Sequence, residues 1–164
     1  MRILGIDPGF AIVGYGVLDY ENTRFGVISS GVITTPQICL ENRLKLIFDK
    51  LNEMILQFSP DHVAIEKLFF TNNQKTAIDV AQARGVIMLA AVQGALELFE
   101  YTPLQIKQAV VGFGRAEKKQ VIAMISNLLK LHSKIDDEAD ALAVAVCHAH
   151  SFRKGVSNSN GSWI

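Results

Sequence analysis

Apolar and polar residues alternate along the first third of the chain with the period of two that is typical of β-strands. The alternation covers three segments, at residues 2–7, 13–20 and 25–34. Turn-forming residues separate them: a Pro-Gly pair at positions 8 and 9, and the polar stretch 20–23. The pattern therefore predicts a three-stranded meander at the start of the fold.

The spacing then becomes helical. Between residues 43 and 58 the apolar side chains recur every three or four positions and share one helix face, at Leu44, Ile47, Leu51, Met54, Ile55 and Phe58. We expect Asn42 to cap the start of this helix and Pro60 to end it. A short strand at 62–66 follows, and then a long helical segment from about 74 to 98.

That long segment is apolar on all sides between residues 86 and 92. Such a helix is either buried centrally or covered by a partner, and the sequence leaves both open. The remaining pattern predicts a strand at 99–101 and helices at 104–111, 116–131 and from Asp136 or Asp137 to 152, with Thr102 and Pro103 opening the first of these helices. We expect one domain, residues 1–155, and a flexible tail at 156–164.

Composition supports a single globular domain, because the 164 residues are 49% hydrophobic and 20% charged. The two cysteines, Cys39 and Cys147, lie far apart and exclude a disulfide scaffold. No apolar run reaches the roughly 20 residues of a membrane-spanning helix. Asp7 and Pro8 interrupt the apolar N-terminus, so a signal peptide is not expected. These features predict a cytoplasmic protein.

Four carboxylates stand where chemistry is expected. Asp7 and Glu66 each end an otherwise apolar strand, and burial there costs several kcal/mol unless a cation compensates. Asp137 and Asp140 are three positions apart and share a face of the last helix. Oxygen ligands without His or Cys suit Mg²⁺ or Mn²⁺ better than zinc. Two such ions would activate water and stabilise the leaving oxygen of a phosphodiester.

Simpler interpretations exist for parts of this set. An Asp at a helix start, including those at 136–140, is often only a cap or a partner of the helix dipole. Asp7 with the Pro-Gly pair could form an ordinary turn. Neither interpretation explains Glu66, and the combination of all four carboxylates favours a metal site.

Two further features could serve nucleic-acid binding. Residues 101–130 carry five basic side chains against Glu117 alone, a local charge of +4 within a chain of net charge +0. The basic residues are Lys107, Arg115, Lys118, Lys119 and Lys130. They form either a solvated helix surface or a phosphate-binding patch. Phe69 and Phe70 follow Glu66 in a predicted loop, where they could pack in the core or stack on a base.

An ordered set of motifs carries a strong family resemblance. The motifs are Gly5-Ile6-Asp7-Pro8-Gly9, Gly14-Tyr15-Gly16, Ala64-Ile65-Glu66, Gln82-Ala83-Arg84-Gly85, Lys107-Gln108 with Val110-Val111-Gly112, Ala116-Glu117-Lys118, and Asp137 with Asp140-Ala141-Leu142-Ala143. Over residues 1 to about 150 the chain resembles the RuvC family of Holliday-junction resolvases. The resemblance implies an α/β, RNase H-like (integrase-type) fold with a central mixed five-stranded sheet flanked by helices.

The resemblance also implies an activity. It implies a homodimeric endonuclease that resolves four-way DNA junctions in recombination and repair, with two Mg²⁺ ions per site, for which Mn²⁺ can substitute. RuvA and RuvB are the implied protein partners. Paired nicks in opposed strands would leave 5′-phosphate and 3′-hydroxyl ends. A junction-binding module without activity and an actin-like ATPase are the alternatives; the first would lack the acidic set, and the second needs two lobes.

The matched positions imply roles for single residues. Asp7, Glu66, Asp137 and Asp140 match the catalytic and metal-binding carboxylates, and Lys107 and Lys118 match basic positions that contact DNA phosphates. Phe69 matches an aromatic residue at the junction crossover, and the neighbouring Lys119 and Arg115 are further DNA-binding candidates. Asp136 adds a competing carboxylate, although the spacing to Asp140 favours Asp137. Phe10 and Ala11 stand where relatives commonly carry polar or basic residues.

Overall fold

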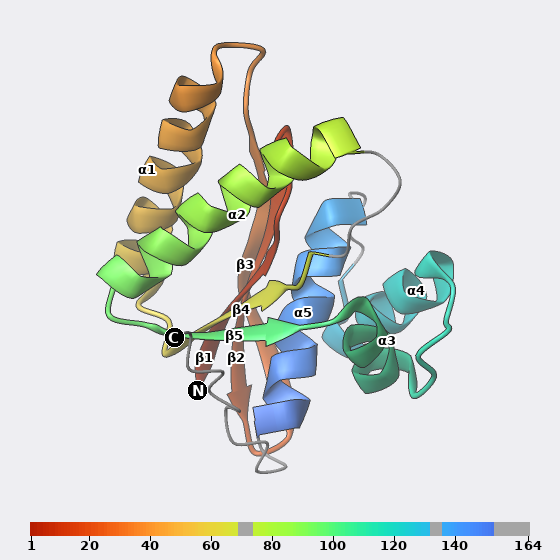
Figure 1. Ribbon diagram of the computed structural model, residues 1–164. Helices are drawn as coiled ribbons and strands as arrows, with labels where there is room; N and C mark the ends of the chain where they lie inside the picture. The colour runs from red at the N-terminus through yellow and green to blue at the C-terminus, as the bar shows by residue number, and fades with distance from the viewer. Residues whose placement is uncertain (69–73, 132–135, 153–164) are drawn as a thin grey trace, which may run out of the picture.

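The computed structural model describes residues 1–68, 74–131 and 136–152, with only the backbone for 74–76. Phe69, Phe70 and the tail predicted at 156–164 lie outside the described residues. The strands are β1 (Arg2–Asp7), β2 (Ile12–Glu21), β3 (Arg24–Thr34), β4 (His62–Glu66) and β5 (Glu97–Tyr101) (Figure 1). The helices are α1 (Leu40–Phe58), α2 (Gln74–Gln93), α3 (Pro103–Val111), α4 (Lys118–Leu129) and α5 (Asp136–Phe152).

The five strands form one mixed sheet in the order β3-β2-β1-β4-β5. β1, β2 and β3 make the predicted antiparallel meander, while β4 and β5 run parallel to β1. Ile6 of β1 is aligned with Ile65 of β4, so the residues that follow, Asp7 and Glu66, end neighbouring strands at one edge of the sheet. The mixed five-stranded sheet predicted from the sequence is therefore confirmed.

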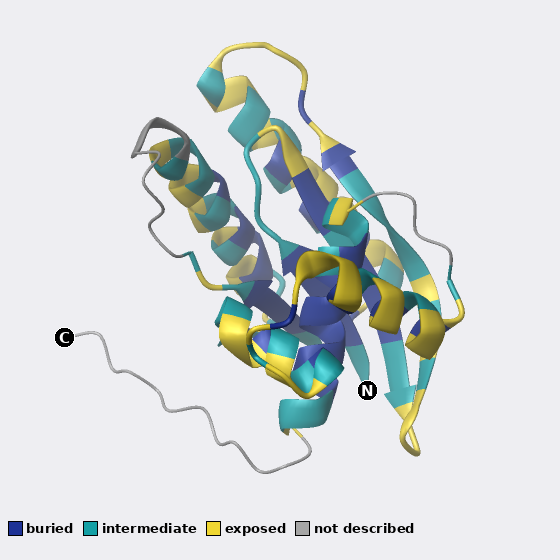
Figure 2. Ribbon diagram, turned by 90° about the vertical axis from the view of Figure 1, so that its right-hand side faces the viewer, coloured by how far each residue is buried: buried dark blue, intermediate teal, exposed yellow. Residues whose placement is uncertain are grey.

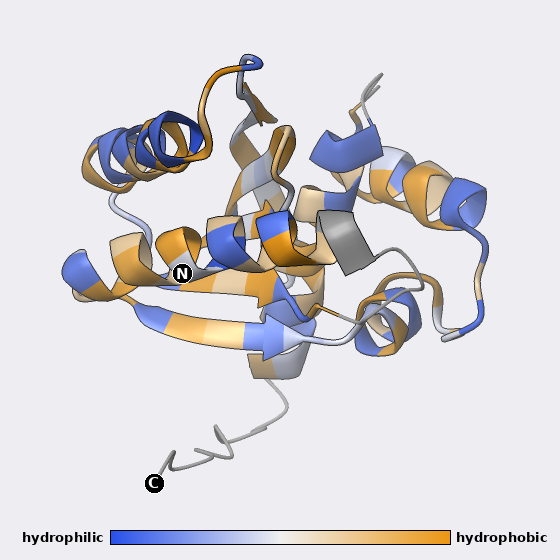
Figure 3. Ribbon diagram, turned by 45° about the horizontal axis from the view of Figure 1, so that its top comes forward, coloured by the Kyte–Doolittle hydropathy of each residue, from blue (hydrophilic) through white to orange (hydrophobic). Residues whose placement is uncertain are grey.

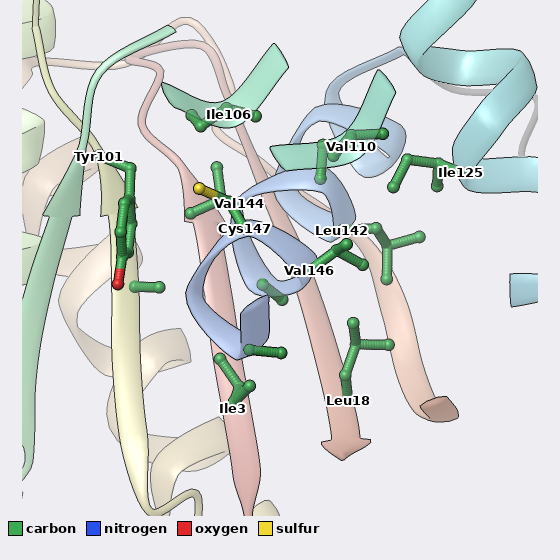
Figure 4. Close-up of a cluster of buried hydrophobic side chains, with 14 of the residues drawn as sticks. Ile3, Leu18, Tyr101, Ile106, Val110, Ile125, Leu142, Val144, Val146 and Cys147 are labelled. Atoms are coloured by element: carbon green, nitrogen blue, oxygen red, sulfur yellow. The ribbon is translucent and has the colours of Figure 1, made fainter. Parts of the chain in front are cut away.

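Helices cover both faces of this sheet (Figure 1). On one face, α1 and α2 pack on the alternate apolar residues of β1 and β2, among them Leu4, Ile6 and Val13. On the other face, α3, α4 and α5 pack on Ile3, Leu18 and Phe99, as Figure 4 shows for part of this cluster. Alternation along each strand decides these faces, since neighbouring residues point in opposite directions. None of the described helices is long and apolar enough to cross a membrane.

α5 is the most buried helix, and its central residues from Ala141 to Ala149 have almost no exposed surface (Figure 2). Glycines in the strands allow its close approach. A Cβ atom added to Gly5 would lie 2.3 Å from the backbone oxygen of Ala141, and one added to Gly14 would lie 2.0 Å from that of Asp137. The alanines of α5 and the glycines of the sheet therefore bring helix backbone and strand backbone together.

Helix boundaries differ from the predictions in α1, α2 and α4, where the helix predicted at 116–131 runs only from Lys118 to Leu129. Cys39, and not Asn42, is the N-cap of α1; Asn42 lies in the first turn and donates from Nδ2 to the Cys39 Sγ at 2.9 Å. The predicted helix at 74–98 ends at Gln93, because Gly94 and the left-handed Ala95 (φ 55°) turn the chain. β5 then starts at Glu97 and gives each residue of β4 a partner. Pairing along the whole length of β4 outweighs the helical pattern at these positions.

A buried histidine joins α5 to β4 and β5. The imidazole of His148 is fully buried, with its Nδ1 2.8 Å from the Tyr101 hydroxyl and its Nε2 2.9 Å from Nδ1 of His62. Both ring nitrogens therefore have partners, which is how a buried polar group avoids a penalty. Burial, together with the nearby His62, lowers the pKa of His148 to about 3.

The protein is expected to lose stability in acid through this histidine. The unfolded chain takes up a proton near pH 6.5, whereas folded His148 does so only near pH 3. The contribution of neutral His148 to the free energy of unfolding is therefore complete above pH 6.5 and decreases as the pH falls toward 3. NMR of the His148 ring nitrogens should show a neutral imidazole at pH 5. A titration midpoint near 6.5 would contradict the prediction.

Candidate active site

The four predicted carboxylates lie at the end of β1 and β4 and at the start of α5. Asp7 and Glu66 end β1 and β4, and α5 crosses one face of the sheet with Asp137 and Asp140 in its first turns. Asp7 is paired across the hairpin with Gly14, against which the backbone of Asp137 packs. Strand register and the close approach of α5 thus bring together residues that are up to 133 positions apart.

These carboxylates influence one another electrostatically. Burial, followed by the negative charges of Glu66, Asp140 and Asp137, raises the pKa of Asp7 to about 7. Burial and the charge of Asp140 also raise the pKa of Glu66, against the opposing effect of Lys107 and Lys118. Without a cation, the site therefore resists ionisation of its own acids.

Lys118 provides one positive charge. Its Nζ lies 2.9 Å from Oδ2 of Asp140 and 3.5 Å from Oδ2 of Asp136. Burial opposes the charged form of Lys118, but the hydrogen bond and the charge of Asp140 outweigh it and raise the pKa above its usual value. Asp136 is therefore turned toward a lysine at the start of α4.

A cavity of about 260 Å³ opens beside these groups. Its polar lining consists of Glu66, Lys107, Lys118 and Asp140, and its apolar wall of Pro103, Ile106, Val121 and Ala143. Elements β4, α3, α4 and α5 all contribute. Two acids and two lysines facing one apolar-walled cavity suit a phosphodiester, which needs both a cation site and phosphate contacts. The sequence did not single out the apolar wall, because its residues have the ordinary spacing of core positions.

The donor set fits a divalent cation. Oxygen ligands are what Mg²⁺ and Mn²⁺ prefer, and no salt bridge among the described residues neutralises Asp7 or Glu66. A bound cation would stabilise the ionised forms of these two acids, which the raised pKa values show to be disfavoured without it. In the described part of the chain, however, no three acidic, histidine or cysteine side chains surround a common point. The acids are neighbours, with Asp140 held by Lys118.

The other predicted DNA contacts separate into groups. Lys107 and Lys118 line the cavity. Lys119 and Arg115 are exposed and do not line it. Phe69 lies outside the described residues, so its stacking role stays a prediction. The structure thus gathers two of the basic candidates and leaves two at the surface.

Known proteins resemble the chain along nearly its whole length. A family model described as crossover junction endodeoxyribonuclease RuvC matches residues 3–148. The chain belongs to the RuvC family. The family member of Alkaliphilus oremlandii is 55% identical over 92% of this chain and 94% of its own. That of Clostridioides difficile is 50% identical over the full length of both chains.

Solved structures of the RuvC family have the same architecture. The Thermus thermophilus RuvC structure superposes with a TM-score of 0.87 at 34% identity, covering 94% of this chain and 97% of its own. The same protein in complex with a Holliday junction substrate gives 0.88 at 33% identity, covering 94% and 96%. The fold is therefore the RNase H-like fold predicted from the motifs. Membership of this nuclease family implies endodeoxyribonuclease activity and use of a divalent metal, and it disfavours the actin-like ATPase alternative.

Proposed function

We propose that the chain is a structure-selective endonuclease that resolves four-way (Holliday) DNA junctions by paired nicks in opposed strands, in recombination and DNA repair. One observation carries the proposal: Glu66 and Asp140 share a cavity with Lys107 and Lys118, next to Asp7. An acidic group for a cation and a basic wall for phosphate are the two requirements of phosphodiester hydrolysis. A junction-binding module without activity would need only the basic wall.

The acidic and the basic residues of the site have different roles in this proposal. Asp7, Glu66, Asp137 and Asp140 would hold two Mg²⁺ ions, for which Mn²⁺ could substitute. When bound, such a pair supplies Lewis-acid activation of water and stabilises charge at the leaving oxygen. Lys107 binds a phosphate oxygen and orients the strand. Lys118 exchanges its contact with Asp140 for DNA phosphate. The products carry 5′-phosphate and 3′-hydroxyl ends.

The decisive experiment uses a synthetic four-way junction with labelled arms. With Mg²⁺ or Mn²⁺ the protein should introduce symmetric nicks, and T4 ligase should reseal them because each carries a 5′-phosphate and a 3′-hydroxyl. With EDTA it should bind the junction without cutting. Linear duplex of the same sequence serves as the control. Junction binding without cleavage in either metal would instead favour the binding module.

Lys107→Ala is expected to weaken junction binding in EDTA. The slope of log K against log salt should fall by about one unit, because one phosphate contact releases about one counterion. Lys45→Ala is a suitable control, since Lys45 is exposed on α1 and pairs with Asp49. Binding titrations between 50 and 200 mM salt measure the slope. An unchanged slope would mean that Lys107 does not contact phosphate.

A second copy of the chain completes the proposed enzyme. α2 buries Ile87, Ala90 and Ala91 against the sheet, yet it leaves an apolar stripe exposed, consisting of Ile78, Leu89 and Val92 with exposed fractions of 62%, 51% and 64%. The apolar colour along the C-terminal half of α2 is visible in Figure 3. One face of residues 86–92 is therefore buried in the domain, and the exposed apolar face supports the proposal that a partner covers it. A C₂ dimer through the stripe would present two identical sites to a two-fold symmetric junction.

Leu89→Glu is therefore expected to convert a dimer into a monomer. A charge in the centre of the stripe opposes burial against its own copy. Light scattering after gel filtration measures the mass, and the junction assay should show single nicks in place of paired ones. Leu56→Glu on α1, where Leu56 is 81% exposed outside the stripe, should leave the mass unchanged. A monomeric parent protein would contradict the dimer proposal.

Two further parts of the proposal follow from the family resemblance. RuvA and RuvB are proposed as partners, and co-purification with a bound junction would test this. The cytoplasm is the proposed location, since that is where such a protein meets chromosomal DNA.

A further inference from the structure

The turn between β1 and β2 follows Asp7 and is tied to a distant part of the chain. Thr35 is only 8% exposed, and its hydroxyl donates to the backbone oxygen of Phe10 at 2.8 Å. The amide of Thr35 donates to the backbone oxygen of Ala11 at 2.9 Å. Gly9 lies in this turn at a point where a side chain does not fit, because an added Cβ would lie 1.9 Å from the backbone oxygen of Ile12. The turn is therefore held from the end of β3.

Arg43 of α1 closes the same network. Its guanidinium carbon lies 3.8 Å from the centre of the Phe10 ring. Its Nε donates to the Thr35 hydroxyl at 2.8 Å, and its Nη2 donates to the backbone oxygen of Phe10 at 3.4 Å. Among the described residues no carboxylate forms a salt bridge with Arg43. The guanidinium of Arg43 thus contacts the turn and Thr35, and not a carboxylate.

We infer that Arg43, together with Thr35, is a positioning residue that fixes the turn after Asp7 and so holds the Asp7 carboxylate for metal binding. The inference rests on the proposed function, in which Asp7 is a metal ligand. Asp7 is the last residue of β1, and the backbone oxygens of Phe10 and Ala11, which Thr35 and Arg43 hold, lie three and four residues after it. A free turn would therefore let the end of β1 and its carboxylate move. Arg43 and Thr35, which we call the clamp, oppose that movement from outside the acidic cluster.

The chemistry of the clamp requires arginine. A planar guanidinium can stack on an aromatic ring while its edge donates hydrogen bonds to a hydroxyl and a carbonyl. An ammonium provides a point charge without a flat face or a fork. Phe10 supplies the aromatic face in this chain. Lysine at position 43 should therefore keep the charge and lose the function.

The test measures metal binding apart from cleavage. Mn²⁺ affinity of the DNA-free protein is determined by calorimetry for the parent, Arg43→Met, Arg43→Lys and Thr35→Val, with Lys45→Met as the control on the exposed side of α1. We expect at least a tenfold loss of Mn²⁺ affinity and of kcat at saturating junction for both Arg43 variants, a smaller loss for Thr35→Val, and none for the control. Junction affinity in EDTA should change less than threefold.

Two results would overturn the inference. The first is unchanged Mn²⁺ affinity and kcat in Arg43→Met with weaker junction binding and a lower salt slope, which would make Arg43 a phosphate contact. The second is full rescue by Arg43→Lys, which would mean that only the charge matters. If Arg43→Met fails to fold, Phe10→Leu must still lower Mn²⁺ affinity or the inference is wrong. Failure of the proposed function is distinct, since the parent protein itself would then neither bind Mn²⁺ nor cut.

Discussion

Replacing Asp7 by Asn is expected to abolish junction cleavage and, at the same time, to stabilise the metal-free protein. Cleavage is lost because an amide is a poor ligand for Mg²⁺. Stability rises because burial, and then the charges of Glu66, Asp140 and Asp137, raise the pKa of Asp7 from 3.8 to about 7. That shift is equivalent to at most about 4 kcal/mol against the ionised form.

The stabilisation of the metal-free protein by Asp7→Asn depends on pH. A carboxylate with a raised pKa costs no stability below pH 3.8, and the cost is fully present above about pH 7. Asp7→Asn should therefore melt several degrees higher than the parent at pH 8 and equally at pH 4. Mg²⁺ should raise the melting temperature of the parent and not of the variant, since only the parent binds it in the folded state.

Asp136→Asn is the matched control for the acidic cluster. Asp136 is exposed and lies 3.5 Å from the Lys118 ammonium, so its loss should leave cleavage intact. Asp137→Asn should be inactive. An active Asp137→Asn with an inactive Asp136→Asn would reverse the assignment of the ligand. Scanning calorimetry and the junction assay, each with and without Mg²⁺, measure both properties.

Gly14→Ala is expected to lower the cleavage rate by at least two orders of magnitude. The added Cβ would lie 2.0 Å from the backbone oxygen of Asp137 and 2.7 Å from its carbonyl carbon. Neither atom belongs to a flexible side chain, so α5 must move away from β2 and take Asp137 and Asp140 with it. A misplacement of about 1 Å is enough to cost a hundredfold in rate. Overpacking should also destabilise the fold by about 1 to 3 kcal/mol.

Gly26→Ala tests whether this effect comes from the close approach of α5. Gly26 lies in β3, and an added Cβ would meet only the Asp19 Cβ at 3.9 Å, an ordinary contact. Alanine within a strand should stabilise by about 0.5 to 1 kcal/mol relative to glycine. Junction cleavage and thermal unfolding of the two variants give the comparison. Normal cleavage by Gly14→Ala would show that α5 has room the structure does not indicate.

The fold was predictable where the pattern was local. Alternation in the first third predicted the meander, and the Thr102-Pro103 pair predicted the start of α3. The end of α2 was not predictable, because residues 94–98 favour a helix in sequence but pair with β4 in space. Cys39 at the start of α1 shows the same limit, since the side chain of this N-cap makes no capping hydrogen bond that could mark it.

The site was predictable to a different extent. Asp7 and Glu66 could be recognised as charges at the ends of apolar strands, and Asp140 as a further carboxylate on a helix. The network at Arg43 was not visible, because an arginine on an amphipathic helix has the pattern of a solvated residue. Its partners, Phe10 and Thr35, are 33 and 8 positions away. Only their meeting in space gives Arg43 a role.

Because Asp137 and Asp140 lie directly before Ala141–Ala149, the buried stretch of α5, their position depends on the packing of the core. The amides of Ala141–Ala149 should exchange with solvent only when the whole domain unfolds, whereas those of exposed turns exchange through small local openings. Heat should therefore remove activity and native structure in a single step, without an inactive folded species at lower temperature. We therefore expect activity and tertiary structure to be lost at the same temperature.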